Sequence, residues 1–472
     1  MSDLGNGRTN RQLWRETDRV DPPKRPAPER VADFHEIYSL LDEASVREQA
    51  SRCIQCPQPS CQEGCPLSNR IPEWLALAAE GKFMEAAEVS QATSNMPEIC
   101  PRVCPQERLC EGACILVGHA EPICIGAIEK FINEYAMARG GITVSCAPPN
   151  GRRVAVVGSG PGGLACADEL AKMGYAVTIF ESQSEAGGLL LNGIPAFKLE
   201  KSVVTRRLDI LRQRGVNFKL GVTVGVDVHL GDLLVDFQAV FLGVGAQKAK
   251  PLGLPGEDMP GIHQALPFLV QYNSTMPLEI APIPVAGRRV AVVGGGDTAM
   301  DCLRTALRAG ATEAVCVYRR DLANMPGSRK EYYNALEETA QFLFLTNPIA
   351  LEADAQGHVA GVRCVKMELG EPDASGRQKP RAVRGSEFTL SVDLILVAYG
   401  FDPVPFPVGS DLARVALNDW GAIRVNEQQM TNVPGVFAGG DASRGASLVV
   451  HAVRDGRKAA LGIHRYLGSP HS

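Results

Sequence analysis

Two copies of one short pattern constrain the fold of this chain most strongly. Each copy has a run of β-branched residues, a turn rich in glycine and a helical segment; the first begins RRVAVVGSGPGG at residue 152 and the second RRVAVVGGGDTA at residue 288. A strand that leads through G-x-G-x-x-G into a helix binds the pyrophosphate of a dinucleotide, because glycine lets the backbone approach the phosphates at the helix N-terminus. Ala299 replaces the third glycine of the second copy, which this motif allows. The repeat therefore predicts α/β structure with two Rossmann-like dinucleotide-binding domains.

The segment after each copy indicates which dinucleotide is bound. After the first copy, the strand 176–180 ends at Glu181, whose carboxylate can accept hydrogen bonds from the ribose of FAD or NAD(H) and repels a 2′-phosphate. After the second copy, Arg319 and Arg320 stand at the corresponding place, and guanidinium groups suit the 2′-phosphate of NADPH. The alternatives are a turn without a ligand in the first copy and a solvated basic turn in the second.

These assignments predict a flavin and a nicotinamide in one chain. Hydride transfer between them depends on orientation, so no side-chain acid or base is expected to be catalytic. The residues expected at the first site are Gly158, Gly160, Pro161, Gly163 and Glu181, and those expected to hold NADPH are Gly294, Gly296, Asp297, Thr298, Arg319 and Arg320.

Clustered cysteines are the second strong feature of the chain. Eight of its 14 cysteines form the runs Cys53-x2-Cys56-x4-Cys61-x3-Cys65-Pro66 and Cys100-x3-Cys104-Pro105-x4-Cys110-x3-Cys114. Eight thiols are the number that two [4Fe–4S] clusters need, and in ferredoxin runs the cysteine before proline binds the other cluster, so we expect Cys65 to leave the first three. Closed four-cysteine zinc sites are the alternative. Zinc is redox-inert, however, whereas an electron carrier fits beside a flavin.

Composition sets limits on the class of protein. Hydrophobic residues make up 45% and charged residues 21% of the chain, as in ordinary globular proteins. The net charge of −5 argues against a broad nucleic-acid-binding surface. Neither a long apolar run nor an apolar N-terminal signal is visible, so we expect a cytoplasmic protein without a transmembrane helix.

The order of the patterns divides the chain. A proline-rich N-terminal arm is expected over 1–35, followed by a helical iron–sulfur domain and linker over 36–150, with one helix over 71–80. The FAD domain is expected over 151–283 and 402–472, and the NADPH domain over 284–401. The NADPH domain would therefore interrupt the FAD domain.

Further segments resemble those of one family, the small (β) subunits of bacterial NADPH-dependent glutamate synthase. The resemblance covers nearly the whole chain, and the N-terminal half of dihydropyrimidine dehydrogenase is similar but more distant. The segments that carry it are Asp33–Tyr38 (DFHEIY), GGLL at 187–190, GIPAFKL at 193–199, YRRD at 318–321 and NMPGS at 324–328.

The resemblance implies an adrenodoxin-reductase-like FAD/NADPH module behind a helical domain with two [4Fe–4S] clusters. The family's small subunit takes hydride from NADPH onto FAD and passes electrons through its clusters to a large (α) subunit carrying FMN. That large subunit makes L-glutamate from L-glutamine and 2-oxoglutarate. A pyrimidine- or ferredoxin-linked NADPH oxidoreductase with another partner, and a non-catalytic redox-sensing subunit, are the alternatives.

The resemblance also implies roles for individual residues. One cluster would be held by Cys53, Cys56, Cys61 and Cys114, and the other by Cys65, Cys104, Cys110 and Glu129. The relatives carry glutamine in place of Glu129, whereas counting thiols alone would choose Cys100 as the eighth ligand. Further FAD contacts are expected from Gly188, Leu189, Gly440, Asp441 and Leu448, with a helix starting at Gly445 near the flavin.

Overall fold

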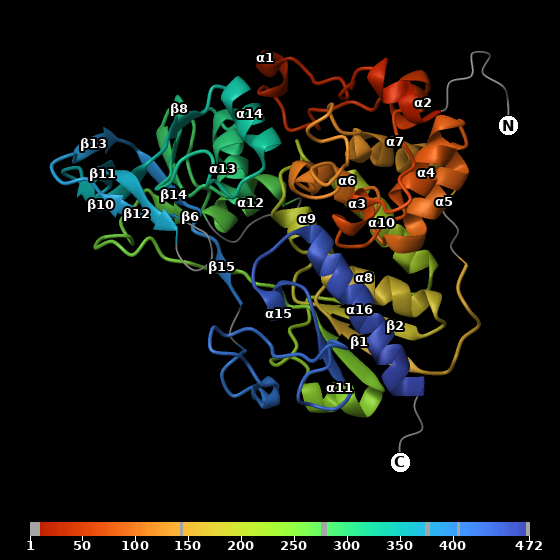
Figure 1. Cartoon of the computed structure of the whole chain (residues 1–472). Helices are drawn as coiled ribbons and strands as arrows, with labels where there is room; N and C mark the ends of the chain where they lie inside the picture. Colours follow the sequence, from red (N-terminus) through yellow and green to blue (C-terminus); the bar gives the residue numbers. More distant parts are fainter. Residues whose placement is uncertain (1–9, 142–144, 275–280, 373–377, 404–405, 469–472) are drawn as a thin grey trace.

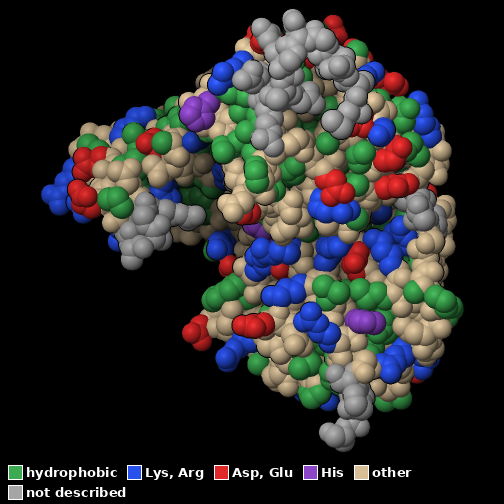
Figure 2. Space-filling view, turned by 45° about the vertical axis from the view of Figure 1, so that its right-hand side comes forward, with side chains coloured by type: hydrophobic (Ala, Val, Ile, Leu, Met, Phe, Trp, Pro, Cys, Tyr) green, Lys and Arg blue, Asp and Glu red, His purple; other side chains and the backbone are tan. Residues whose placement is uncertain are grey.

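The computed structural model describes residues 10–141, 145–274, 281–372, 378–403 and 406–468. It has a helical N-terminal part and two α/β parts, which is the predicted architecture (Figure 1). Among the described residues, no helix has the length and apolar character needed to span a membrane. Basic side chains gather across the middle of one face (Figure 2), although the net charge of the chain is −5.

The N-terminal part consists of short helices packed around Trp74, whose side chain is fully buried. The predicted helix at 71–80 is confirmed by α4, which has proline in its first turn. Asp42 caps α2 by accepting a hydrogen bond from the backbone N–H of Ser45 at 2.7 Å. The elements are η1 (Asn10–Arg15), α1 (Ala27–Arg30), α2 (Glu43–Ser51), α3 (Ser60–Glu63), α4 (Ile71–Ala79), α5 (Phe83–Thr93), α6 (Cys100–Val103), η2 (Gln106–Arg108) and α7 (Ile125–Ala138).

The first α/β part is built on a parallel sheet with strand order β16-β4-β1-β2-β3. Its strands are β1 (Arg153–Val157), β2 (Ala176–Glu181), β3 (Asn217–Leu220), β4 (Ala239–Leu242) and β16 (Val436–Ala438). Its helices are α8 (Pro161–Lys172), α9 (Leu189–Asn192), α10 (Lys201–Gln213), α11 (Leu230–Asp236), η3 (Asp411–Arg414), α15 (Asp441–Arg444) and α16 (Val449–Gly468). Because β16 comes from the end of the chain, the chain leaves this sheet after β4 and later returns to it.

Helices α8 and α16 approach each other closely in this part (Figure 1). A Cβ atom on Gly456 would lie 2.1 Å from the carbonyl oxygen of Gly162, so only glycine allows this approach. The contact places the start of α16 beside the first glycine-rich turn. The helix expected from Gly445 begins at Val449, because Gly445 has a φ of +82° and ends α15 instead.

The second α/β part has a parallel sheet with strand order β6-β14-β7-β8-β9. Its strands are β6 (Ile262–Gln264), β7 (Arg289–Val293), β8 (Glu313–Val317), β9 (Gln341–Leu343) and β14 (Leu394–Val397), and its helices are α12 (Ala265–Asn273), α13 (Asp297–Arg308) and α14 (Arg329–Glu337). A separate antiparallel sheet, inserted in the chain between β9 and β14, contains β10 (Thr346–Ala353), β11 (Val359–Pro372), β12 (Gln378–Ala382) and β13 (Phe388–Ser391). Strands β5 (Lys248–Ala249) and β15 (Phe401–Asp402) pair where the chain passes between the two parts.

One element of this second sheet comes earlier in the chain than the expected boundary at residue 284. Strand β6 pairs with β14, and Phe268 and Leu269 of α12 are buried in the same core as β7 and α13. Hydrophobic packing therefore joins residues 262–273 to the second part, although they precede the second glycine-rich motif in the chain.

Candidate functional site

The first glycine-rich turn connects β1 to α8 and leaves room at its centre. Gly158 has a φ of +94°, and a Cβ there would lie 2.5 Å from the carbonyl oxygen of Gly243. A Cβ on Gly163 would lie 2.0 Å from the carbonyl oxygen of Gly158. In contrast, a Cβ on Gly160 would meet nothing within 4 Å. Gly160 caps α8, and Pro161 is its first residue, so the space lies at a helix N-terminus, where a phosphate is favoured.

Glu181 ends β2 beside this turn, as predicted. One of its carboxylate oxygens accepts hydrogen bonds from the backbone N–H of Ser159 at 2.9 Å and from its hydroxyl at 2.6 Å. The other accepts from the backbone N–H of Gln183 at 2.9 Å and from the hydroxyl of Ser182 at 3.1 Å. The carboxylate therefore fixes the shape of the turn.

Two later segments converge on the same turn. A Cβ on Gly188, which precedes Leu189 and α9, would lie 2.9 Å from the Cα of Gly160. Gly440 lies beside Gly162 on the other side, just before α15. The structure thus brings together residues that are nearly 300 positions apart in the chain.

Asp441 carries the clearest sign of a missing polar partner. Its Oδ1 atom is buried and has no hydrogen-bond partner, and burial raises the pKa of its carboxyl to about 7. A buried polar atom without a partner is costly, so it fits a ligand hydroxyl or another donor at this position. Leu448, the other residue predicted here, directly precedes α16.

Two asparagines that the sequence analysis missed share this property. The Oδ1 atoms of Asn192 in α9 and Asn273 in α12 are buried without hydrogen-bond partners. Asn273 donates its side-chain amide to the carbonyl oxygen of Gly193 at 3.4 Å, across the junction of the two α/β parts. No motif marks an isolated asparagine in an apolar segment, so only the fold reveals them.

The second glycine-rich turn has the same open centre. A Cβ on Gly294 would lie 2.3 Å from the carbonyl oxygen of Ala398, whereas a Cβ on Gly296 would meet nothing within 4 Å. Gly296 caps α13, whose first residues are Asp297 and Thr298. Asp297 accepts a hydrogen bond from the backbone N–H of Ser328 at 2.9 Å, which ties the segment before α14 to this turn.

The two predicted arginines follow β8 near this turn. Arg319 is exposed and lies near Tyr399; burial raises the pKa of this tyrosine while Arg319 opposes the shift. Arg320 donates from Nε to the carbonyl oxygen of Gln378 at 3.0 Å, so its position is fixed by the start of β12. By strand register Tyr318 takes the place that Glu181 has in the first part, and the two arginines directly follow it.

The cysteines of the N-terminal part separate into two groups. The first contains Cys53, Cys56, Cys61 and Cys114. Burial raises the pKa of the Cys61 thiol to about 12, and Cys53, Cys114 and Cys56 are the neighbouring thiols that raise it further. Cys53 behaves alike, with its pKa raised by burial to about 11. Folding thus brings Cys61 and Cys114, which are far apart in the sequence, into one group, and Cys65 does not belong to this first group.

The second group surrounds a separate small cavity. Cys65, Cys104 and Cys110 line it together with both candidates for the eighth ligand, Cys100 and Glu129. The pKa of the Cys104 thiol is raised mainly by a hydrogen bond with the Cys100 thiol, and burial is the second-largest cause. The structure therefore places both candidates at the site.

Glu129 is held in place by neutral donors. Its Oε1 atom accepts hydrogen bonds from the side-chain amide of Asn69 at 2.8 Å and from the hydroxyl of Ser90 at 3.0 Å. Burial raises the pKa of its carboxyl to about 7. Among the described residues, no three acidic, cysteine or histidine side chains converge on one point that could hold a single metal ion. The donor set still fits a four-iron cluster, since each cysteine of a cubane binds a different iron.

Comparison with known families gives two matches that divide the chain in the same order. Residues 30–141 match the family model described as dihydropyrimidine dehydrogenase domain II, 4Fe-4S cluster. Residues 152–456 match the model described as pyridine nucleotide-disulphide oxidoreductase. The first match supports the iron–sulfur interpretation of the cysteine runs over the zinc alternative.

Solved structures share the fold of the two α/β parts. FprA from Mycobacterium tuberculosis, solved in complex with NADPH, aligns with a TM-score of 0.57 and 23% identity over 68% of this chain and 85% of FprA. Thioredoxin reductase of Lactococcus lactis aligns with a TM-score of 0.50 and 20% identity over 67% of this chain and 99% of that one. At these identities the likeness concerns the fold.

Curated relatives are much more similar in sequence. The Escherichia coli K12 "Glutamate synthase [NADPH] small chain" is 46% identical over 95% of this chain and 97% of its own length. The Azospirillum brasilense protein of the same name is 46% identical over 94% of each chain. The E. coli "Putative oxidoreductase AegA" is 47% identical over 95% of this chain but only 70% of its own length. This chain is therefore an NADPH-dependent oxidoreductase with an iron–sulfur domain, and it belongs to the family of glutamate synthase [NADPH] small chains.

Proposed function

We propose that the chain is the electron-input subunit of a glutamate synthase. It oxidises NADPH at FAD and passes electrons through two [4Fe–4S] clusters to a large subunit that carries FMN and makes L-glutamate from L-glutamine and 2-oxoglutarate. When bound, FAD supplies the conversion between a two-electron hydride and single electrons. The observation that carries the proposal is the separation of the cysteine ligands into two groups beside a pair of open dinucleotide turns.

The geometry supports a different ligand for each of the two α/β parts. In this proposal the first α/β part holds FAD through the turn at Gly158–Gly163, Glu181, Gly188–Leu189, Gly440–Asp441 and Leu448. The second holds NADPH through Gly294–Thr298, Arg319 and Arg320. We place the start of the NADPH-binding part at β6 rather than at residue 284, because β6 and α12 belong to its sheet and core.

The surroundings of the cysteines support an order for the two clusters. Val450 of α16 lines the cavity of the second group, so this group lies next to the proposed FAD part. In the first group, Cys114 is followed by Ile115 and Val117, which are about half exposed. Electrons would thus pass from FAD to the cluster of Cys65, Cys104 and Cys110, then to the cluster of Cys114 and on to the partner.

Anaerobic reduction tests the proposed input reaction. NADPH mixed with the purified holoprotein should bleach the flavin absorbance and then reduce the clusters, and chemical analysis should find about eight irons per chain if two four-iron clusters are present. A protein whose flavin stays oxidised in excess NADPH would contradict the input role. Co-purification with a large FMN-containing subunit, and glutamate formation by the pair, test the partner.

A second candidate function has one specific observation in its favour. AegA matches 95% of this chain, yet this chain covers only 70% of AegA, so a closely similar module also occurs within a longer oxidoreductase. A differently partnered NADPH oxidoreductase would reduce its flavin with NADPH equally well. It would differ in failing to support glutamate synthesis with the large subunit, and that assay separates the two candidates.

The eighth cluster ligand can be tested by a pair of substitutions. We favour Glu129, so Glu129→Ala should lose the second cluster while Cys100→Ala keeps it. Glu129→Gln is the matched variant. It keeps the shape of the side chain and a carbonyl oxygen that can bind iron, as the glutamine of the relatives would. Iron content and electron paramagnetic resonance of the reduced protein report the loss; an intact second cluster in Glu129→Ala would contradict the assignment.

A further inference from the structure

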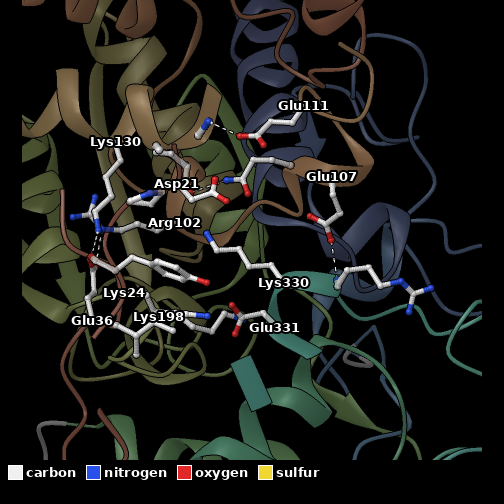
Figure 3. Close-up of a pocket in the computed structure, with 18 of the residues that line it drawn as sticks. Asp21, Lys24, Glu36, Arg102, Glu107, Glu111, Lys130, Lys198, Lys330 and Glu331 are labelled. Carbon is white, nitrogen blue, oxygen red and sulfur yellow. Dashed lines mark hydrogen bonds and ion pairs between the residues drawn. The ribbon is translucent and has the colours of Figure 1, made fainter. Parts of the chain in front are cut away.

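Two adjacent residues of the first α/β part, Phe197 and Lys198, pack against helices of the second part. They belong to the segment 193–200, which connects α9 to α10. The Lys198 ammonium forms an ion pair with Asp301 of α13 at 2.9 Å, and about nine-tenths of each side chain is buried. Figure 3 shows Lys198 beside Glu331 of α14 as well. Burial would lower the pKa of the Lys198 ammonium, but these two carboxylates raise it, so the lysine stays charged.

The ring of Phe197 contacts the same helix. It is 1% exposed, and the guanidinium carbons of Arg304 and Arg308 lie 4.3 and 4.1 Å from its centroid. Asp301, Arg304 and Arg308 are spaced three and then four residues apart along α13, so all three lie on one face of this helix. That face of α13 is therefore the surface against which Phe197 and Lys198 pack.

The start of the segment is fixed by hydrogen bonds from both parts. Asn273 of α12, in the second part, donates its side-chain amide to the carbonyl oxygen of Gly193 at 3.4 Å. Lys201 of α10, in the first part, donates to the carbonyl oxygen of Ile194 at 2.5 Å. The segment is therefore attached to each part at more than one point, and it can set their relative orientation.

The same contacts connect the two glycine-rich turns. A Cβ on Gly188, just before α9, would lie 2.9 Å from the Cα of Gly160 in the first turn, and the segment 193–200 directly follows α9. At the other end, Asp301 lies about one helical turn after Asp297, with which α13 begins beyond the second turn. A continuous path of packed elements thus runs from one turn to the other through the ion pair.

We propose that Lys198 and Asp301 are positioning residues for hydride transfer, because their ion pair holds α13 in the orientation that brings NADPH against the flavin. The inference rests on the proposed function, in which a hydride carries two electrons from NADPH to FAD and leaves NADP⁺ and two-electron-reduced FAD. Such a transfer depends on distance and alignment, and a displacement of about 1 Å can cost roughly a hundredfold in rate. Both side chains are buried in the junction and act through the orientation of α13.

Anaerobic stopped-flow reduction of the full-length holoprotein at saturating NADPH tests the proposal. Lys198→Met and Asp301→Asn should each lower the rate constant of flavin reduction about tenfold or more, while the Kd for NADP⁺ from calorimetry stays within about threefold. The double variant leaves no buried charge unpaired, and its rate should be no lower than that of the single variants, because the two residues act as a unit. Asp393→Asn is the matched control: it removes an ion pair with Arg289 at 2.7 Å, at the far end of the second sheet from its glycine-rich turn, and should leave the rate unchanged.

Hydrogen exchange of the oxidised holoprotein gives a second readout that needs no turnover. Backbone amides of the segment 193–200 and of α13 should exchange faster in the two single variants and the double variant than in the wild type or Asp393→Asn. Unchanged exchange, an unchanged rate of flavin reduction, a rate loss in the double variant equal to the product of the single losses, or a matching loss of NADP⁺ affinity would overturn the proposal. If NADPH fails to reduce the flavin of the wild type, the proposed function is wrong, and the exchange comparison still decides whether the pair fixes α13.

Discussion

Glu338 joins the N-terminal arm to the second α/β part, and replacing it by glutamine should destabilise that junction. Its side chain is fully buried and lies just after α14. It accepts from Arg30 of the arm at 2.7 Å, from Arg304 at 2.9 Å and from Arg308 at 2.6 Å. Glu338→Gln keeps the shape of the side chain but leaves three buried guanidiniums, those of Arg30, Arg304 and Arg308, without their shared anion.

The magnitude follows from the charge of this carboxylate. Burial alone would raise the pKa of Glu338, but hydrogen bonds from Arg308 and Arg304 lower it from 4.5 to about 2. A shift of this size corresponds to about 3 kcal/mol of stability, in line with the roughly 3–5 kcal/mol lost when one partner of a buried ion pair is removed. Because the pKa is lowered in the folded state, this stability is present above pH 4.5 and is lost as the pH falls towards 2.

Thermal unfolding followed by circular dichroism, with limited trypsin digestion of the arm, measures the effect. A loss of about 3 kcal/mol should lower the melting midpoint of the second part by roughly 6–12 °C and expose the arm to cleavage. Glu337→Gln is the matched control: this neighbour also pairs with Arg30, but its side chain is 43% exposed, so a change of about 0–1 kcal/mol is expected. Equal midpoints for the two variants at pH 7 would refute the reasoning.

Three further substitutions test other parts of the molecule. Gly456→Ala should cost about 1–3 kcal/mol in thermal unfolding, since its methyl group would lie 2.1 Å from a carbonyl oxygen of α8; Gly468→Ala, with open space around it, is the control. Asp441→Ala should lower the flavin content of the purified protein by about tenfold, because it removes the buried acceptor; full flavin occupancy would contradict the FAD assignment. Arg320→Ala should raise the KM for NADPH by about tenfold and leave that for NADH unchanged, as measured with ferricyanide as acceptor. An equal effect on both nucleotides would contradict a contact to the 2′-phosphate.

The sequence predicted those features of the fold that depend on local patterns. The strands before both glycine-rich turns, the helices after them and the helix at 71–80 follow from period and turn chemistry, and the structure has all of them. The separation of Cys65 from Cys53, Cys56 and Cys61 was also predictable, since cysteine spacing and the following proline are sequence properties.

Features that depend on contacts between distant segments could not be predicted in this way. Strand β6 has only three residues and no glycine motif, so its place in the second sheet becomes visible only through pairing with β14. Asn192 and Asn273 are notable only because folding buries their oxygen atoms without partners.

The two glycine-rich turns are alike in sequence but are stabilised differently, which bears on how nucleotide preference can be changed. In the first turn, the acid that would select an unphosphorylated ribose also accepts hydrogen bonds from Ser159. The second turn has no such acid; instead the backbone N–H of Gly327 donates to the carbonyl oxygen of Gly295 at 2.9 Å, and Asp297 accepts from Ser328. The segment at 327–328 thus supports the turn and leaves the end of β8 available for arginines. Replacing Arg319 by glutamate would therefore remove the proposed contact to the 2′-phosphate without creating the network of the first turn, so we expect loss of NADPH affinity rather than a switch to NADH.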